Sequence, residues 1–533
     1  MHPSAGWRRI PFALAALAVP LLIGECSKSG TEPQSSSALA KVSGDLQGAP
    51  AGQAVALPLV VQVTSGSAAV SGATVTFAVA TGGGSVGTPS AVTGANGRAQ
   101  TTWTLGATVG TQTVTASITG ASPATFTATA QPTSGAANVA LLDGNNQPGL
   151  VGYGVNWRPA VLVTDVNNAP VANATVTFAV QSGGGSVTGG TATTNASGIA
   201  QVAKWKLGAS AGVNTLTATV SGAGVLGNPV AFADTGVAPG YTIQIQYFGP
   251  SPNAATQAAI DSAVAKWQRL IYRALPSITL NLAAKAACGD TTAPALNVTT
   301  TGLVILAKFD SIDGPGKVLG QAGPCAVRNS DGLTVLGEME FDTADVATMN
   351  SNGTLSEVML HEMGHVIGFG TLWNNPPNAW LQLSSNPPGT ILDTYFSGPK
   401  ARAAFDSSGG LTYTGASLSP AGGHKVPVEN CGASSPSGCG VGTVNGHWRE
   451  PVFGNELMTG YINSGTNPLS IVSVAAQEDL GYTVNYDAAD AYVHAFTAPA
   501  VGGSARVDLG NDVRPGPIVV VDAAGRVVRT LQR

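Results

Sequence analysis

Between residues 38 and 238, apolar and polar side chains alternate in short runs separated by turns rich in Gly, Asn and Ser. Alternation with a period of two predicts strands that bury one face. The run ATVTFAV at 73–79 recurs unchanged at 174–180, and a GGGSV run follows each copy. The sequence therefore predicts two homologous all-β sandwiches, at 38–133 and 134–238, after a short linker at 27–37.

The two modules resemble the bacterial immunoglobulin-like repeats of surface proteins. The resemblance implies two immunoglobulin-like sandwiches of about 100 residues each, with Trp103 and Trp205 in their cores. It also implies either a stalk or spacer, which is the simpler interpretation, or adhesion through contact with a cell surface or a carbohydrate. Nothing in the modules indicates catalysis.

From residue 239 the pattern changes to a mixture of strands and helices. Residues 241–247 alternate as a strand, and apolar side chains between residues 260 and 271 recur at helical spacing. Residues 469–480 predict another apolar helix. We therefore expect an α+β domain over 239–490.

The final segment, 491–533, is expected to be a small β appendage. Its apolar run at 517–522, the turn at Gly525 and the apolar residues that follow predict a hairpin. Two roles stay open for it: capping the preceding domain, or sorting.

The chain's clearest chemistry lies in the sequence HEMGH, at 361–365. On a helix, residues four apart share a face, so His361 and His365 can bind one zinc ion. Glu362 would then lean over the water at that ion. Two metal ligands and one carboxylate base are the smallest set of residues that metal-assisted peptide hydrolysis requires.

Signals on both sides of this sequence support a helix. Thr354 followed by Glu357 matches a capping box, and an apolar run leads into the histidines. Gly368 and Gly370 come directly afterwards, and glycine tolerates left-handed backbone dihedrals. Gly368 is therefore expected to end the helix and turn the chain beneath the metal, as a third ligand from downstream requires.

In metzincin zinc peptidases the pattern is HExxHxxGxxH, and here position 371 is Thr instead of the third His. Downstream, His447 lies in GHWRE, shortly before FGNELMTG. This arrangement resembles the leishmanolysin family, in which an insertion separates the helix from the third histidine and a methionine turn follows. The resemblance covers about residues 241–486. It maps the third ligand to His447, in preference to His424, and the methionine turn to Met458.

The resemblance implies a metalloendopeptidase that hydrolyses polypeptides with one catalytic Zn²⁺ bound by His361, His365 and His447. Three neutral imidazoles leave one open position, where the pKa of bound water falls from about 15.7 to near 7. Glu362 would take the proton of that water and return it to the leaving amine.

Residues 337–342 alternate as a strand directly before the motif helix. Metzincin relatives use an edge strand to hold substrate in an extended form, so we expect this strand to do the same. Glu338, Glu340 and Asp342 share one of its faces. That face either favours basic substrate residues or is simply solvated.

Two alternatives compete with the peptidase hypothesis. One is a surface adhesin or binding protein with a catalytically degenerate metallopeptidase domain, although the intact Glu362 argues against it. The other keeps zinc hydrolysis but takes the last ligand from an acid, as in gluzincins. Glu429 and Glu478 are its candidates, and neither lies in the helical pattern that gluzincins use.

The N-terminus predicts export. Arg8 and Arg9 precede an apolar stretch at 11–23, which is too short for a membrane span and suits a signal peptide over 1–26. The protein is therefore expected to be secreted or cell-surface. Lipid attachment at Cys26 stays open without being favoured, because Glu25 occupies a position where a small residue is expected.

Four further cysteines lie in the predicted catalytic domain, an even number that suits disulfides in an oxidising compartment. Three pairings are open. Proximity favours Cys288 with Cys325 and Cys431 with Cys439.

Composition narrows the partners. Charged residues make up 10% of the chain, against about 25% in typical soluble proteins. The net charge of -5 and the lack of a basic stripe argue against nucleic-acid binding.

Overall fold

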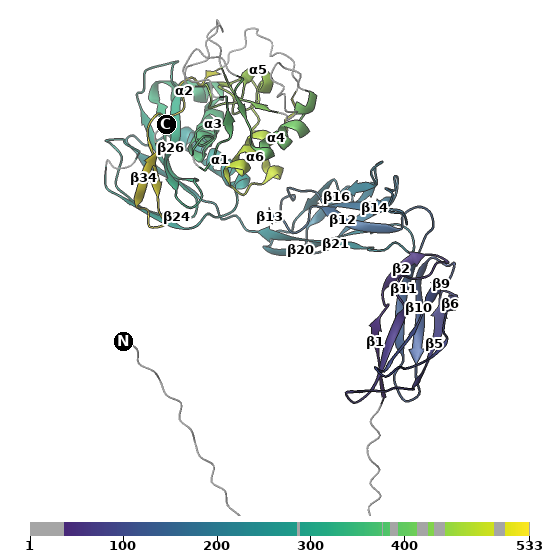
Figure 1. The fold of residues 1–533 in the computed structure, drawn as a ribbon. Coiled ribbons are helices and arrows are strands. Elements are labelled where there is room, and N and C mark those ends of the chain that lie inside the picture. Colours follow the sequence, from purple (N-terminus) through teal and green to yellow (C-terminus); the bar gives the residue numbers. More distant parts are fainter. Residues whose placement is uncertain are drawn as a thin grey trace, which may run out of the picture. The chain divides into compact units, whose positions relative to one another are not determined.

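The computed structural model describes residues 37–284, 288–375, 377–383, 393–412, 425–430, 443–494 and 507–531. The described chain is mostly β, and it divides after Ala130 into two compact units. The first unit is one β-sandwich. The second unit holds another sandwich and a region of mixed helices and strands (Figure 1).

The first sandwich packs a sheet of order β2-β11-β10-β5-β7 against a four-stranded sheet in which β3 pairs with β1, β4 and β8. Strands β6 and β9 form a further two-stranded sheet. Its strands are β1 (Ser37–Ser43), β2 (Gln47–Pro50), β3 (Leu59–Ser65), β4 (Ala68–Ala69), β5 (Thr74–Thr81), β6 (Gly84–Val86), β7 (Ser90–Val92), β8 (Arg98–Thr101), β9 (Trp103–Leu105), β10 (Gly110–Ser117) and β11 (Ala124–Gln131).

The second sandwich repeats this topology, with a sheet of order β13-β21-β20-β15-β17 and a second sheet of order β12-β14-β18. Its strands are β12 (Asn138–Asp143), β13 (Pro148–Leu150), β14 (Ala160–Thr164), β15 (Thr175–Ser182), β16 (Ser186–Thr188), β17 (Thr191–Thr193), β18 (Ile199–Gln201), β19 (Lys204–Lys206), β20 (Gly212–Val220) and β21 (Val230–Val237). Trp103 and Trp205 are fully buried in the two cores. The predicted repeat and its core tryptophans are confirmed.

The mixed region is built on a six-stranded sheet of order β22-β25-β27-β26-β33-β34. These strands are β22 (Ile243–Phe248), β25 (Leu303–Asp310), β27 (Thr334–Asp342), β26 (Gly320–Arg328), β33 (Ile518–Val521) and β34 (Val527–Leu531). The first three are mutually parallel, and β26 runs antiparallel to β27.

The prediction that residues 337–342 form a substrate-holding edge strand was wrong. They lie in β27, which pairs with β25 on one side and β26 on the other. Alternation reveals which side chains share a face but not how many neighbours a strand has. Of the three acids, Glu338 and Asp342 are buried, so they do not form a solvated face either.

Both faces of the sheet are covered. Helices α1 (Ala254–Leu270) and α3 (Leu355–Ile367) pack on one face, where Ile305, Met339 and Phe341 contribute to the main core. The hairpin of β23 (Ile278–Leu282) and β24 (Leu296–Thr300) packs on the other face, against alternate residues such as Val304 and Leu336. Period-two alternation along β25 and β27 thus feeds two separate cores.

The remaining described elements surround the main core. They are α2 (Thr343–Asn352), β28 (Leu381–Gln382), β29 (Tyr395–Phe396), α4 (Pro399–Ser407), η1 (Gly410–Thr412), β30 (Val426–Pro427), α5 (Glu450–Phe453), β31 (Tyr461–Ile462), α6 (Ile471–Leu480), η2 (Tyr486–Ala488) and β32 (Val507–Asp508). The predicted helices over 260–271 and 469–480 correspond to α1 and α6. The predicted tail hairpin is β33 and β34, and it is part of the main sheet.

Two local predictions have different outcomes. The capping box was wrong, because the Thr354 side chain makes no cap and the carboxylate of Glu357 instead accepts hydrogen bonds from Asn467. The disulfide between Cys288 and Cys325 is confirmed. Cys431, Cys439, Cys26, His424 and the predicted signal peptide lie outside the described residues.

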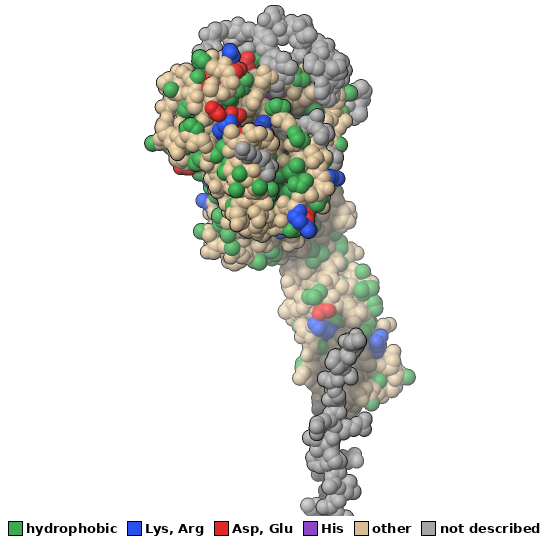
Figure 2. All heavy atoms as spheres, turned by 90° about the vertical axis from the view of Figure 1, so that its left-hand side faces the viewer, with side chains coloured by type: hydrophobic (Ala, Val, Ile, Leu, Met, Phe, Trp, Pro, Cys, Tyr) green, Lys and Arg blue, Asp and Glu red, His purple; other side chains and the backbone are tan. Residues whose placement is uncertain are grey.

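Figure 2 shows few and scattered charged side chains on the face that it presents, as the low charged content predicts. Among the described residues, no helix has the length and apolar character that crossing a membrane would require.

Candidate metal centre

Helix α3 presents His361 and His365 on one face, as their spacing predicts, and both imidazoles are fully buried. Each ring is oriented through its Nδ1 by a backbone carbonyl. His361 Nδ1 lies 2.7 Å from the Leu457 oxygen, and His365 Nδ1 lies 2.9 Å from the Phe369 oxygen. The two Nε2 atoms are thereby directed to a common point, 2.9 Å apart.

Glycines allow the chain to turn behind these histidines. Gly368 ends α3 with a φ of 136°, which brings the Phe369 carbonyl back to His365. Gly370 has a φ of 71°, and a Cβ there would lie 2.1 Å from the Gly446 oxygen. Only glycine allows this close approach, which places the turn before His447 beside the end of the helix. The predicted turn at Gly368 is confirmed.

His447 joins the two helical histidines from far along the chain, and it too is fully buried. Its Nε2 lies 3.2 Å from that of His361 and 3.0 Å from that of His365. Its Nδ1 faces the Thr443 carbonyl at 3.1 Å. Thr371, at the usual position of the third histidine, bonds its hydroxyl to the His365 carbonyl.

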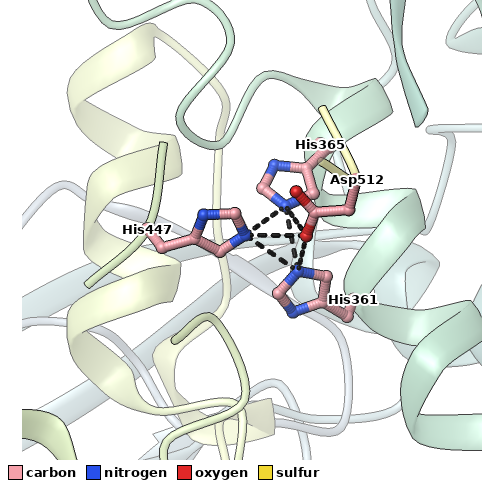
Figure 3. A group of neighbouring side chains, drawn as sticks. All are labelled: His361, His365, His447 and Asp512. Atoms are coloured by element: carbon pink, nitrogen blue, oxygen red, sulfur yellow. Dashed lines mark hydrogen bonds and ion pairs between the residues drawn. The ribbon is translucent and has the colours of Figure 1, made fainter. Parts of the chain in front are cut away.

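A carboxylate completes the group. Asp512, from the C-terminal segment, directs Oδ2 to the three imidazoles, 3.1 Å from His361, 3.6 Å from His365 and 2.9 Å from His447 (Figure 3). Asp512 is 1% exposed. The four donor atoms thus form a compact and closed cluster.

The spacing of the four donors fits a metal ion. Ligands bound tetrahedrally at about 2.0–2.1 Å from Zn²⁺ lie about 3.3 Å from one another. The six donor separations in the cluster range from 2.9 to 3.6 Å. A set of three His nitrogens and one Asp oxygen is also a donor set that zinc prefers.

Hydrogen bonding gives an independent reason for a cation. A backbone carbonyl only accepts, so each Nδ1 must carry the hydrogen and each Nε2 presents a lone pair. Three lone pairs and a carboxylate oxygen therefore face one another at short range. A single proton can join only two of these atoms, whereas a metal ion contacts all four.

Burial and the charges of the neighbouring donors shift the pKa values in the cluster. Burial lowers the pKa of His361 to about 4 and lowers that of His365 as well. Burial also disfavours the charged form of His447, but the Asp512 carboxylate outweighs it and raises the pKa of His447. Burial acts to raise the pKa of Asp512, yet the imidazoles hold it well below its usual range. Neutral His361 and His365 with ionised Asp512 are the forms that bind metal.

Glu362 is fully buried next to the cluster, and neither of its carboxylate oxygens receives a hydrogen bond from the described part of the chain. Two causes raise the pKa of Glu362 well above its ordinary value: burial, which is the larger, and the nearby charge of Asp512. A carboxyl group with a raised pKa and free acceptor atoms suits proton transfer.

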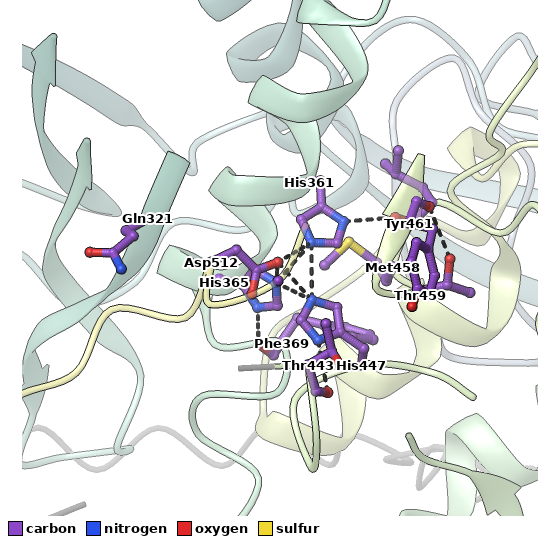
Figure 4. A network of polar contacts seen from close by, with 12 residues as sticks. Gln321, His361, His365, Phe369, Thr443, His447, Met458, Thr459, Tyr461 and Asp512 are labelled. Carbon is purple, nitrogen blue, oxygen red and sulfur yellow. Dashed lines mark hydrogen bonds and ion pairs between the residues drawn. The ribbon is translucent and has the colours of Figure 1, made fainter. Parts of the chain in front are cut away.

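Met458 lies beneath the histidines, as predicted. It is fully buried, and a Cβ on Gly364 of α3 would lie 2.9 Å from its Cε, so sulfur and helix are in close contact (Figure 4). Trp448 N donates to the Met458 oxygen at 3.0 Å, which ties this turn to His447. The carboxylate of Glu456 bonds Met458 N and Ser470 N, joining the turn to α6.

Other candidate acids and histidines lie elsewhere. Glu429 accepts from the backbone N–H of Glu450, and Glu478 pairs with Lys400, so neither belongs to the cluster. His494, a further downstream histidine, packs between Phe405 and Phe453.

Sequence reasoning missed Asp512. The acid alternative was wrong, because it put Glu429 or Glu478 in place of the third histidine, whereas His447 is in the cluster and Asp512 is a fourth donor. The run LGNDVRPG carries no motif, and Asp512 lies 151 positions from His361. Long-range pairing of the tail, with β31 and with the main sheet, brings it to the site.

Comparison with known proteins gives little further information. No protein-family model matches the chain, and no curated protein matches it. Among solved structures, the D0-D1 domain of intimin is 18% identical with a TM-score of 0.21, over 38% of this chain and 96% of that one. The adhesin InvE of Yersinia pseudotuberculosis is 20% identical with a TM-score of 0.17, over 38% of this chain and 61% of that one. Invasin, a bacterial integrin-binding protein, is 16% identical with a TM-score of 0.16, over 56% of this chain and 52% of that one. Likenesses this weak carry no argument about binding or catalysis.

Proposed function

We propose that the chain is an exported zinc-dependent endopeptidase of the metzincin type, similar to leishmanolysin, that cleaves polypeptides. The observation that carries the proposal is the convergence of His361, His365 and His447 at metal-ligand spacing, with the unpaired Glu362 beside them. A protein that used the metal only for stability would have no use for a buried carboxyl with two free acceptor atoms.

Zinc, when bound, supplies Lewis-acid chemistry for attack on a peptide carbonyl. The chain's own contribution is orientation and proton transfer. The carbonyls of Leu457, Phe369 and Thr443 fix the three imidazoles. Glu362 accepts the proton of the attacking water and returns it to the leaving amine. Burial raises the pKa of Glu362, which favours its holding that proton between the two steps.

A second candidate is favoured by a different observation. With Asp512 the cluster has four protein donors and 0–1% exposure, and closed four-donor sites are typical of structural zinc. In that case the chain is a surface adhesin or binding protein, built on tandem sandwiches and stabilised by a metal domain.

The two candidates are separated in a variant that opens the fourth position. Asp512→Ala is loaded with zinc, and cleavage of an unfolded protein is compared with that by Asp512→Ala/Glu362→Gln. A peptidase loses at least about 100-fold on losing its general base, while zinc content stays the same. Absence of cleavage in both proteins, with zinc bound, favours the structural metal site.

A further inference from the structure

The C-terminal segment 507–514 passes the metal cluster as β32, a turn at residues 510–511 and a single bridge from Val513 to Ala322. At its start, β32 pairs with β31, directly after the Met458 turn, and Leu509 N donates to the Gly460 oxygen at 3.1 Å. At its end, the backbone N–H of Ala322 donates to the backbone carbonyl of Asp512 at 2.7 Å. The backbone N–H of Arg514 donates to the backbone carbonyl of Ala322 at 2.9 Å. Asp512 lies between these two attachments.

The second attachment occupies the edge of the main sheet. Strand β26 pairs with β27 along its length, whereas β33 covers its other edge only at residues 326–328. Near Ala322, that edge is paired with Val513 instead. The Gln321 side chain also donates to the Asn511 oxygen at 3.0 Å, and Figure 4 places Asp512 between Gln321 and Tyr461.

A chain that pairs with a sheet edge beside a metal is in the position of a polypeptide substrate. Main-chain pairing of this kind binds peptides with little sequence preference. The sequence predicted a substrate-holding edge at residues 337–342, and the corresponding edge of the sheet belongs to β26. The chain's own tail pairs with that edge at Ala322.

The segment is held by few buried groups, unlike the hairpin that follows it. Leu509 and Asp512 are its buried side chains, whereas Ile518, Val520 and Val521 anchor β33 in the cores. Arg514 adds an ion pair of 3.2 Å to Glu338 and a hydrogen bond to the Cys288 oxygen. Segments with few buried contacts open at low cost while the rest of the fold persists.

We infer that segment 507–514 is a built-in inhibitor that occupies the edge of β26 where a substrate would pair and supplies Asp512 as a displaceable fourth metal ligand. The inference rests on the proposed peptidase function. Release of the segment would free one position on the metal and the edge of β26 together. A polypeptide could then pair with Ala322 in place of Val513.

The experiment uses full-length wild type, Asp512→Ala, Arg514→Gln and, as a matched control in the same tail, Asp522→Asn. Asp522 caps a turn with Arg526 and lies outside the cluster. Arg514→Gln loosens the segment but leaves all four donors in place, so it remains informative if Asp512→Ala fails to fold. Each protein is loaded with Co²⁺, and its visible absorption is recorded with and without acetohydroxamate. Cleavage of an unfolded protein is measured on the zinc forms.

The inference predicts that acetohydroxamate leaves the spectra of wild type and Asp522→Asn unchanged but alters that of Asp512→Ala. Cleavage should rise at least about tenfold in Asp512→Ala, as expected if the open state is under one tenth of wild-type molecules. Arg514→Gln should lie between wild type and Asp512→Ala in both measurements.

Three results would overturn it. If wild type and Asp512→Ala respond and cleave equally, the segment does not inhibit, although the peptidase function stands. If Asp512→Ala and Arg514→Gln both lose the metal, Asp512 is a permanent ligand. If Asp512→Ala binds metal and acetohydroxamate but cleaves nothing, the peptidase function itself fails.

Discussion

Oδ2 of Asp512 lies 2.9 Å from Nε2 of His447, although 65 positions separate the two residues. Neither belongs to the helix that carries His361 and His365. Half of the donor set therefore depends on loops and a tail whose positions are fixed by the sheet, by the Met458 turn and by close glycine contacts. Variants of these supports should therefore weaken metal binding even where they leave the four donors in place.

His447→Ala should lower zinc affinity at least about 100-fold, because loss of a direct ligand exceeds the 10–100-fold effect of losing an outer partner. The measurement is zinc stoichiometry after dialysis against a graded metal buffer. His424→Ala is the matched control and should bind zinc like wild type. Equal zinc loss in both variants, or loss in His424→Ala alone, would refute the assignment of His447.

Gly364→Ala should destabilise the domain, because its Cβ would lie 2.9 Å from Met458 Cε and 3.2 Å from Trp267 Cζ2. Overpacking of this kind costs about 1–3 kcal/mol. Met458→Ala should cost about 2–5 kcal/mol through the cavity that it leaves.

In the double variant the new methyl group enters the space that Met458 vacates, so the two costs should not add. We expect a coupling of at least about 1 kcal/mol in a double-mutant cycle of urea denaturation, with Met458→Leu as a volume-matched control. Additive effects would mean that Met458 does not pack on α3 at Gly364.

The helical half of the metal site was predictable because its chemistry is local. Four-residue spacing puts His361 and His365 on one face whatever surrounds the helix, and Gly368 must follow where the chain reverses. The contribution of Asp512 depends on a tail pairing with β26. No local pattern encodes that pairing, so the sequence did not predict Asp512.

The same distinction between local and long-range interactions explains which predictions about the fold were wrong. Alternation in residues 337–342 predicted a strand, and β27 is one, but whether it is an edge depends on strands distant in sequence. Thr354 and Glu357 matched a capping box, yet Asn467, 110 positions away, binds the Glu357 carboxylate. By contrast, the two sandwiches were predictable because each repeats the other's pattern of alternation.

Removal of the disulfide between Cys288 and Cys325 should cost about 3–4 kcal/mol, from the loop-closure entropy of its 37-residue span. The Cys288 carbonyl also accepts from Arg514, so the variant should loosen segment 507–514. Denaturant unfolding of Cys288→Ala/Cys325→Ala tests the first effect, and hydrogen exchange of segment 507–514 tests the second. An unchanged midpoint would show that the bridge adds no stability.

A difference between the two sandwiches at one buried position, Ala128 against Asp234, predicts a pH dependence. In the first sandwich Gln112 pairs with Ala128, and in the second Asn214 pairs with Asp234. The side-chain oxygens of Gln112 and Asn214 each accept a hydrogen bond from a glycine N–H in the corresponding turn of their own sandwich. The two positions are therefore equivalent. Asp234 is 0% exposed, and its Oδ2 has no hydrogen-bond partner among the described residues.

Burial raises the pKa of Asp234 to about 6, from an ordinary value of 3.8. The folded state therefore favours the protonated form. Its stabilising contribution is complete below pH 3.8 and is lost as the pH rises through about 6. At about 1.4 kcal/mol for each pKa unit, the loss is at most about 3 kcal/mol.

Hydrogen exchange of β21 in the full chain, corrected for the intrinsic rate, should therefore show lower protection at pH 7.5 than at pH 4.5. Strand β11, which carries Ala128 at the same position, is the internal control and should show no such difference. Asp234→Asn keeps the acceptor for Gln147 N and removes the buried charge, so it should restore protection of β21 at pH 7.5. If β21 in the wild type and the variant loses protection equally, the pH dependence does not arise from Asp234.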